Sequence, residues 1–287
     1  MSERTFSRVA VAGAGTMGRG IAQSTALAGY ETNLYDVSRE ALDAARPQVD
    51  ASIGKGVELG KVSAEQAARA KDKLKMTSAL ESLAEAELII EAAPEDLDIK
   101  RELFHRLDVL ASGHTIFASN TSSLSINVLA GATQRAEQFL GLHFFNPAHI
   151  MKLVEVIAAD DTRDDVLNTA VTFVRSLGKE PVLCKDTPAF IVNRVARPFY
   201  GEAFRLLGEG SADVNTIDQL MRSAGFAMGP FELIDLVGSD VNFTVTQSVF
   251  DAYFQDPKYR PHPIQRRMVE SGRLGQKSGR GFYKYDE

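Results

Sequence analysis

The chain has 287 residues, a length typical of two domains, and its 44% hydrophobic content suits an ordinary globular core. The formal net charge of −6 argues against a nucleic-acid-binding protein, and the single cysteine, Cys184, excludes a disulfide within the chain and a cysteine-rich metal site, so we expect no metal. The polar first residues and the lack of an apolar run of about 20 residues predict no signal peptide and no membrane helix, so we expect a cytoplasmic protein.

A glycine-rich loop follows the first apolar run, residues 8–12, which predicts a central parallel strand. Helical spacing begins directly after this loop, which consists of Gly13, Ala14, Gly15, Thr16, Met17 and Gly18. Gly13 permits a tight turn, Gly15 lets the backbone approach a pyrophosphate, and Gly18 lets the helix pack close to the strand. The free N–H groups of the helix N-terminus favour an anion. Strand, loop and helix in this order indicate a dinucleotide-binding site.

A second predicted strand, residues 31–35, ends at an acid, Asp36, which lies 18 residues after Gly18. A carboxylate there can accept hydrogen bonds from the adenosine ribose hydroxyls and would repel a 2′-phosphate, so NAD is favoured over NADP. The alternative is that Asp36 only begins the turn before Ser38.

Residues 39–74 are predicted to be helical, with glycines interrupting the pattern. Ser52, Lys55 and Lys61 offer a hydroxyl and two cations to an anionic ligand, although a solvated helix face explains them equally well. Beyond a buried strand at 88–93 and before a helix at 97–110, Glu95 and Lys100 lie at a strand-to-helix junction. Open parallel sheets place their ligands at such junctions. Alternatively, Glu95 is only an acidic residue at the start of the helix and Lys100 only a basic residue on its surface.

Polar residues follow the next predicted strand, residues 115–119, in the loop Asn120, Thr121, Ser122, Ser123, Leu124 and Ser125. Helix capping explains one or two of these side chains but not all of them. The loop therefore supplies neutral donors and acceptors at the carboxyl end of a strand.

A histidine and a glutamate lie within the next two predicted strands. Residues 139–145 form an apolar run that contains His143 and stops at Asn146-Pro147, and residues 152–157 form a second run that contains Glu155. If the two strands lie side by side, an imidazole and a carboxylate meet at the mouth of a sheet and form a general base. Taken alone, such a pair is more often a core histidine beside a solvent-facing glutamate.

A polar stretch ending at Pro188 follows the last predicted strand, 181–184, and predicts a domain boundary, with domains at 1–187 and 188–287. The second domain is predicted to be helical at 190–207, 213–222, 230–236, 241–253 and 263–271, with a kink or restart at Pro198. The glycine-rich tail is predicted to be an ordered loop, because its aromatic residues favour burial.

The chain resembles the L-3-hydroxyacyl-CoA dehydrogenases, including the short-chain 3-hydroxybutyryl-CoA enzymes, almost from end to end. The resemblance rests on the glycine loop and on the blocks at 119–125 (Ser-Asn-Thr-Ser-Ser-Leu-Ser), 143–147 (His-Phe-Phe-Asn-Pro), 151–156, 190–194, 228–230 and 277–283. It implies an α/β fold, with a Rossmann-like doubly wound N-terminal domain followed by an all-α C-terminal domain that forms most of a homodimer interface. It also implies NAD as cofactor and an acyl-CoA substrate.

The resemblance implies a role for each matching residue. His143 takes the proton from the 3-hydroxyl as hydride leaves C3, and Glu155 holds the imidazole and offsets its charge. Ser122 and Asn193 hydrogen-bond around the reacting oxygen and the thioester. Ser52 matches a CoA contact, and the accompanying lysine corresponds to Lys55 or Lys61. The residues implied near NAD, besides the glycine loop, are Asp36, Glu95, Lys100, Asn120, Asn146 and Lys277.

Two departures from the family pattern are visible. Ala189 stands where the family usually has glycine before Phe-Ile-Val-Asn-Arg, and His149 adds a titratable group after the His-Phe-Phe-Asn-Pro block. The rival interpretations are a dehydrogenase of the same fold for a CoA-linked dicarboxylic acid or a non-CoA hydroxy acid, and a silent NAD-binding structural relative. The acyl-chain length, the presence of a second carboxylate and the direction of the reaction do not follow from the sequence.

Overall fold

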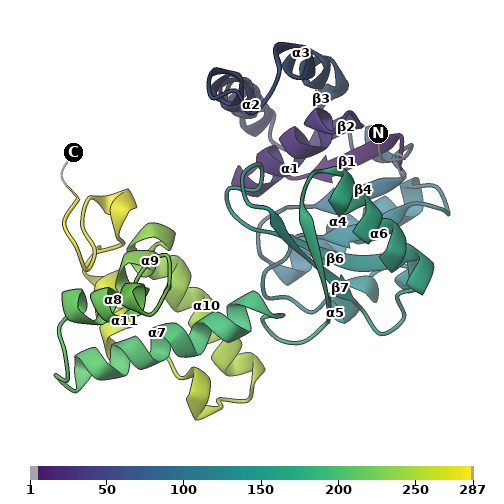
Figure 1. The fold of residues 1–287 in the computed structure, drawn as a ribbon. Helices are drawn as coiled ribbons and strands as arrows, with labels where there is room; N and C mark the ends of the chain where they lie inside the picture. The colour runs from purple at the N-terminus through teal and green to yellow at the C-terminus, as the bar shows by residue number, and fades with distance from the viewer. Residues whose placement is uncertain (1–5, 286–287) are drawn as a thin grey trace. The chain divides into compact units, whose positions relative to one another are not determined.

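A computed structural model describes residues 6–285, in two compact units that divide between Thr187 and Pro188 (Figure 1). The first unit is a sheet covered by helices, and the second is built from helices. The predicted fold class, a Rossmann-like domain followed by a helical domain, is confirmed.

The sheet of the first unit has the strand order β3-β2-β1-β4-β5-β6-β7-β8. All neighbouring strands are parallel except β6 and β7. The order reverses between β1 and β4, which is the kind of switch point where open α/β sheets bind ligands. The strands are β1 (Arg8–Ala12), β2 (Glu31–Tyr35), β3 (Leu74–Thr77), β4 (Leu88–Glu91), β5 (Ile116–Ser119), β6 (Phe139–Phe144), β7 (Leu153–Ala158) and β8 (Glu180–Lys185).

Helices cover the sheet because its central strands are apolar on both faces. Ile21 and Phe173, from α1 and α6, pack into one cluster with the strands, and Phe104 of α4 packs on Phe117 and Phe139. The helices of this unit are α1 (Thr16–Leu27), α2 (Arg39–Glu58), α3 (Ala64–Lys73), α4 (Leu97–Leu110), α5 (Ile126–Ala130) and α6 (Asp164–Ser176).

The segment 39–74 differs from its prediction. The glycines at 54 and 56 do not interrupt α2, and the first helical break comes after Glu58. Leu74, the last residue of the predicted helical segment, begins β3, a strand that was not predicted. Helices α2 and α3 form a hairpin beside β2 and β3 (Figure 1). The strand was missed because its residues, Leu-Lys-Met-Thr, alternate over only four positions and follow a helical pattern without a turn signal.

The second unit contains α7 (Val192–Gly208), α8 (Val214–Ser223), α9 (Pro230–Val237), α10 (Ser239–Ala252) and α11 (Pro263–Glu270). Pro198 lies within α7, which continues through it. The tail is an ordered loop as predicted, since the Asp235 carboxylate accepts hydrogen bonds from the backbone N–H groups of Phe282 and Tyr283 at 3.0 and 2.9 Å. Short 3-10 turns occur at Leu80–Leu83, Ala136–Gln138, Pro257–Tyr259 and Gln276–Ser278.

Ala189, where the resembling family usually has glycine, has a φ of +67°. Left-handed backbone costs a residue with a Cβ about 1 kcal/mol, which glycine avoids. The glycine that the family usually has at this position would adopt the left-handed conformation without this cost, whereas Ala189 adopts it with a Cβ present. No helix within residues 6–285 is both long and apolar enough to span a membrane.

The glycine loop makes a direct prediction for stability. A Cβ at Gly18 would overlap the Gly13 carbonyl oxygen, which is backbone and has no side-chain freedom to move away. We expect Gly18→Ala to destabilise the first unit by about 3 kcal/mol, measured by denaturant unfolding. The matched control is Gly54→Ala within α2, where a Cβ has no neighbour within 4 Å and should stabilise the helix by about 0.5–1 kcal/mol. Equal effects of the two substitutions would contradict this account.

Candidate active site

The glycine loop has the geometry that a bound pyrophosphate requires. Gly13 has a φ of +116°, and its N–H donates to the Tyr35 carbonyl at 2.7 Å, so the loop is fixed between β1 and β2. No atom would lie within 4 Å of a Cβ at Gly15, and Gly15 and Thr16 are exposed at the N-terminus of α1. The loop therefore needs glycine at 13 and 18 and leaves the backbone at Gly15 open to a ligand, which fits a dinucleotide. Met17, half-buried, begins the packed face of α1.

Asp36 lies beside this loop at the carboxyl end of β2. Its Oδ2 accepts a hydrogen bond from the Ala14 N–H at 2.8 Å, and its Oδ1 accepts one from the Ser38 N–H at 2.9 Å. The carboxylate thus both begins a turn and meets the glycine loop, so the two interpretations of Asp36 are compatible.

Glu91 and Lys100 form a buried ion pair that the sequence interpretation missed. Lys100 Nζ lies 2.5 Å from Glu91 Oε1 at the end of β4, and the two side chains are 1% and 0% exposed. Glu91 also accepts hydrogen bonds from the Ser119 hydroxyl and the Ala93 N–H, both at 2.6 Å. Burial raises the pKa of Glu91, and Lys100 with these two donors opposes the shift. An acid inside the apolar run Leu-Ile-Ile-Glu, with a lysine nine residues later, was the available signal.

Glu95 organises the polar loop that follows β5. Its Oε1 accepts hydrogen bonds from the N–H and hydroxyl groups of Ser122 at 2.8 and 3.2 Å, from both groups of Ser123 at 3.1 Å, and from the Thr121 hydroxyl at 2.7 Å. Lys100 Nζ lies 3.3 Å from its other oxygen. Burial alone would raise the pKa of Glu95, but Lys100 and the hydrogen bonds outweigh burial, so the pKa lies below its ordinary value.

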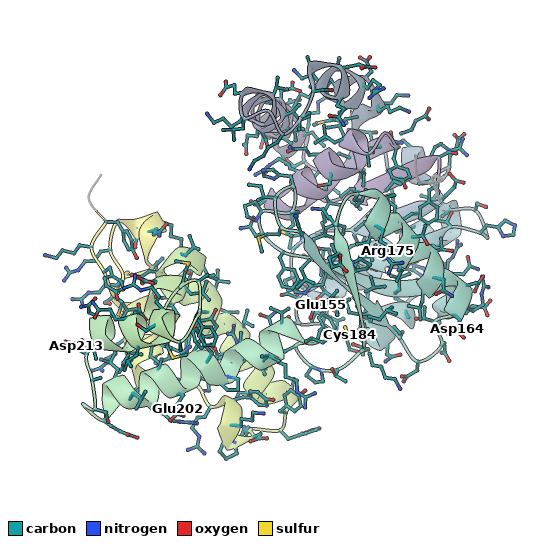
Figure 2. The ribbon with its side chains drawn as sticks, viewed as in Figure 1. Glu155, Asp164, Arg175, Cys184, Glu202 and Asp213 are labelled. Atoms are coloured by element: carbon teal, nitrogen blue, oxygen red, sulfur yellow. The ribbon has the colours of Figure 1, made fainter. Side chains whose placement is uncertain are left out.

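His143 and Glu155 face each other across β6 and β7. The antiparallel register pairs the two residues directly, and His143 Nδ1 lies 2.6 Å from Glu155 Oε2. Glu155 is labelled in Figure 2. Both are buried, with 6% and 0% exposure. Asn120 connects this strand to the polar loop, because its Oδ1 accepts a hydrogen bond from the Phe144 N–H at 2.9 Å. The alternative of a solvent-facing glutamate is excluded by the burial of Glu155.

The remaining predicted site residues are distributed over both units. Asn146 is exposed directly after β6, before the cis bond to Pro147, and Ser52 lies in α2, outside the cluster around Glu95. Asn193 and Lys277 belong to the second unit. Asn193 lies in the first turn of α7, and Lys277 Nζ lies 2.6 Å from Asp240 Oδ1.

Lys61 lines a cationic pocket of about 630 Å³ in the first unit, between the α2–α3 hairpin, α1 and the end of α6. The other basic residues of this pocket are Arg69, Lys73, His149 and Lys179. None of the described residues that line the pocket is acidic, so it favours an anion. Lys55, by contrast, pairs with Glu58 at 3.0 Å on the surface.

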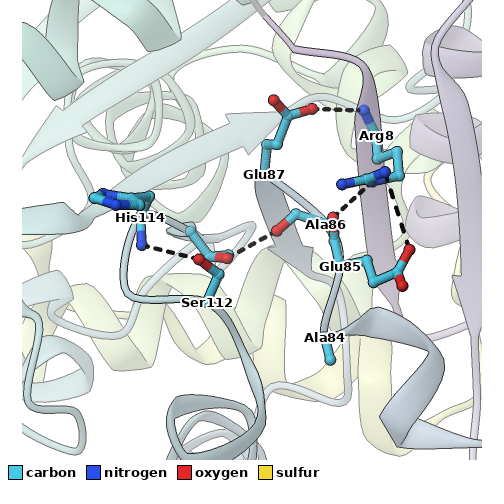
Figure 3. Close-up of a pocket in the computed structure, with 8 residues that line it drawn as sticks. Arg8, Ala84, Glu85, Ala86, Glu87, Ser112 and His114 are labelled. Carbon is cyan, nitrogen blue, oxygen red and sulfur yellow. Dashed lines mark hydrogen bonds and ion pairs between the residues drawn. The ribbon is translucent and has the colours of Figure 1, made fainter.

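Two other features of the first unit lie outside this site. A cavity of about 380 Å³, lined by Arg8, Glu87 and His114 among others, lies at the amino ends of β1, β4 and β5, the edge opposite to the glycine loop (Figure 3). Burial raises the pKa of Cys184 to about 12, so the thiol stays protonated and is not a nucleophile. Within residues 6–285 no cluster of three or more acidic, histidine or cysteine side chains could hold a metal.

The low pKa of Glu95 predicts how a substitution changes stability with pH. Since its pKa is lower in the fold than the ordinary value of 4.5, the carboxylate stabilises the fold above that pH and loses this effect as pH falls through the folded-state pKa. We expect Glu95→Gln to lower the thermal unfolding midpoint at pH 7, with a difference from the unmodified protein that narrows below pH 4.5. Glu58→Gln, which removes an exposed ion pair, should shift the midpoint by only about 1–2 °C. A pH-independent difference for Glu95→Gln would contradict the assignment.

Comparison with known proteins shows the family to which the chain belongs. The family models described as "3-hydroxyacyl-CoA dehydrogenase, NAD binding domain" and "3-hydroxyacyl-CoA dehydrogenase, C-terminal domain" match residues 8–187 and 190–285. A 3-hydroxyadipyl-CoA dehydrogenase of Escherichia coli is 46% identical over 278 residues, which are 96% of this chain and 58% of that protein. The mitochondrial hydroxyacyl-coenzyme A dehydrogenase of Homo sapiens is 41% identical, with 96% of this chain and 90% of that protein covered.

Solved structures agree with these sequence matches. The structure of a 3-hydroxybutyryl-CoA dehydrogenase from Escherichia coli has a TM-score of 0.95 and 46% identity, covering 98% of this chain and 60% of that one. An (S)-3-hydroxybutyryl-CoA dehydrogenase from Ralstonia eutropha has a TM-score of 0.94 and 38% identity, covering 98% and 100%. The chain thus spans less than two thirds of the two Escherichia coli relatives. The predicted NAD cofactor is confirmed, and the chain belongs to the 3-hydroxyacyl-CoA dehydrogenase family, its first unit being the family's NAD-binding domain.

Proposed function

We propose that the protein oxidises (S)-3-hydroxyacyl-CoA to 3-oxoacyl-CoA, with His143 as the general base. The observation that carries this proposal is the buried contact of 2.6 Å between His143 and Glu155, at the sheet edge where the glycine loop also lies. Bound NAD supplies the hydride acceptor, and the residues of the chain move the proton.

The dyad supplies the proton chemistry. Hydride can leave C3 only as the 3-hydroxyl loses its proton, and a positioned imidazole is suited to accepting that proton near neutral pH. With Nδ1 bound to Glu155, His143 exchanges the substrate proton through Nε2. The Glu155 carboxylate fixes the tautomer and offsets the positive charge that forms on the imidazole.

Neutral groups orient the substrate. Ser122 and Asn193 hydrogen-bond around the reacting oxygen and the thioester, without the cost of burying another charge. Glu95 supports the role of Ser122, because it accepts hydrogen bonds from both the N–H and the hydroxyl group of that serine. The geometry of the polar loop therefore depends on Glu95 and, through it, on Lys100.

The NAD contacts are assigned by position. Gly13, Gly15, Thr16, Met17 and Gly18 form the pyrophosphate loop, and Asp36 accepts hydrogen bonds from the adenosine ribose. The other residues that we assign to the NAD site are Glu95, Lys100, Asn120, Asn146 and Lys277. Lys100 acts by holding Glu95 in place, since its Nζ is buried against Glu91 and Glu95.

The CoA moiety is assigned to the α2–α3 hairpin. Ser52 contacts CoA, and Lys61 is the accompanying cation, because it lines the cationic pocket whereas Lys55 already has an acidic partner. CoA carries phosphate groups, which suit a pocket without acidic residues.

A second candidate is a dehydrogenase for a dicarboxylic 3-hydroxyacyl-CoA. It is favoured by the Escherichia coli relative that bears the name 3-hydroxyadipyl-CoA dehydrogenase and is 46% identical to this chain. A silent NAD-binding relative is disfavoured, because Ser122, His143, Glu155 and Asn193 are all present. A free hydroxy acid is disfavoured, because it has no phosphate groups to occupy the cationic pocket.

We also propose a cytoplasmic homodimer. The second unit exposes several large apolar side chains, among them Val195, Leu220, Phe226 and Leu236, which are 69%, 63%, 50% and 52% exposed. Exposed apolar residues of this size favour association between subunits.

The test of the proposed function is NADH oxidation with acetoacetyl-CoA and, separately, with free acetoacetate. We expect turnover with the thioester and little with the free acid, because the acid lacks the CoA moiety. Turnover with neither compound would contradict a short-chain substrate and leave the dicarboxylic candidate, and turnover with free acetoacetate alone would favour a non-CoA substrate.

His143→Gln tests the general base. We expect kcat to fall by about two orders of magnitude or more with NAD binding nearly unchanged, measured by steady-state kinetics and by titration of NADH fluorescence. The matched control is His114→Gln, an exposed histidine at the opposite edge of the sheet, which should leave kcat unaffected. Substantial turnover by His143→Gln would show that another group takes the proton.

A further inference from the structure

Arg197, on α7 of the second unit, is a buried cation held only by neutral groups. It is 6% exposed. Its Nε donates to the Asn193 carbonyl at 3.3 Å, and its Nη1 donates to the Asn242 carbonyl at 3.1 Å and to the Thr246 hydroxyl at 3.0 Å. The guanidinium also lies 4.9 Å from the centre of the Tyr200 ring.

No carboxylate within residues 6–285 pairs with Arg197, and this is unusual for a buried charge. Burial lowers the pKa of Arg197 to about 10, so the guanidinium remains positive at neutral pH. Lys100 shows how a buried cation is usually compensated, since its Nζ lies 2.5 Å from a carboxylate oxygen of Glu91. Lys179, a buried lysine held by carbonyl groups, lines the cationic pocket, where an anion is expected. A buried cation without an acid in this chain therefore suggests a charge that arrives with a ligand.

The guanidinium has donors left for such a ligand. Arginine carries five N–H donors, and the three acceptors around Arg197 occupy the Nε–H and the two hydrogens of Nη1. Nη2 has no acceptor among the described residues. Among the described residues, Nη2 of Arg197 is not one of the fully buried side-chain atoms that lack a hydrogen-bond partner, so it keeps some exposed surface. Nη2 therefore has no acceptor within the described residues and is not fully enclosed.

The position of Arg197 relates it to the substrate. It lies four residues after Asn193 on the same helix, which is a shift of about 6 Å along the axis. Since Asn193 is proposed to hydrogen-bond near the thioester, Arg197 lies about one short acyl chain further along α7. Its Nε also holds the Asn193 carbonyl, so the two residues are fixed relative to each other.

We propose that Arg197 binds the distal carboxylate of a dicarboxylic 3-hydroxyacyl-CoA and so determines the acyl chain that the enzyme prefers. This inference rests on the proposed dehydrogenase function and selects between its two candidates. A carboxylate that accepts hydrogen bonds from Nη2 supplies the missing negative charge. A neutral acyl chain of the same length would leave the guanidinium uncompensated in the complex.

The test compares two six-carbon thioesters that differ at the distal carbon, 3-oxoadipyl-CoA and 3-oxohexanoyl-CoA, as substrates of the full chain with NADH. We expect kcat/KM to favour 3-oxoadipyl-CoA by about tenfold or more, and Arg197→Met to abolish this preference, which is a change of about tenfold or more in the ratio of the two kcat/KM values. Arg197→Lys, which keeps the charge but not the planar fork, should restore part of the preference. The control is Arg205→Met on the same helix, where the guanidinium is exposed and pairs with Glu202, the residue labelled in Figure 2. This substitution should leave the preference unchanged.

The outcomes separate this inference from the proposed function. If Arg197→Met lowered kcat/KM equally for the two thioesters, the role of Arg197 would be only to connect α7 to α10, and the inference would be overturned. In the unmodified protein, unreactive adipyl-CoA should inhibit more strongly than hexanoyl-CoA, and equal inhibition would overturn it without any variant having to fold. Lack of turnover with acetoacetyl-CoA and both six-carbon thioesters would instead overturn the dehydrogenase function itself.

Discussion

The antiparallel pairing of β6 with β7, in a sheet that is otherwise parallel, is the constraint on which the candidate active site depends. Because of it, β7 begins at the edge where β6 ends, so His143 and Glu155 meet there in direct register. A slip of one residue would turn one side chain to the other face of the sheet. Gly141 helps to hold the register, since a Cβ there would lie 2.7 Å from Ile157 Cδ1 on the opposing strand. The base of the proposed reaction is thus a consequence of strand packing.

Three linked charged groups lie at the same edge, of which Glu91 and Lys100 are buried and Glu95 is partly exposed. Glu91 holds Lys100, Lys100 lies beside Glu95, and Glu95 collects the donors of the loop after β5. Each charged group supplies an ion pair or a hydrogen bond to its neighbour, so the free-energy cost of removing the charges from water is offset within the network. The network leaves Ser122 placed by two hydrogen bonds, and Asn120 links the same loop to the end of β6. Ser122 and His143, to which the proposed function assigns substrate orientation and proton transfer, are therefore positioned by one connected structure.

The parts of this arrangement that are local in sequence were predictable. The glycine loop, Asp36 and the apolar strands can each be identified from a few consecutive residues. The two-unit architecture follows from the change from strand-like to helical spacing of apolar residues along the chain. What sequence patterns did not reveal are contacts between distant residues, such as Glu95 with Ser122, and the burial of a charge, as at Glu91. The strand β3 was missed because four alternating residues carry too little pattern to outweigh the helix before them. Arg197 was counted only as part of a helical repeat, because nothing local distinguishes a buried arginine from an exposed one.

The buried cations of the described residues differ in whether an acid of the chain compensates their charge. Lys100 is neutralised by the chain itself, and its role is to hold the polar loop. Lys179 and Arg197 are held by neutral oxygens alone, which orient the cations without cancelling their charge. A dicarboxylic acyl-CoA carries negative charge at both ends, in the CoA phosphates and in the distal carboxylate. On the proposed assignment, each uncompensated cation would gain its counter-ion only in the complex, so the same two groups that destabilise the free protein would favour the binding of the substrate.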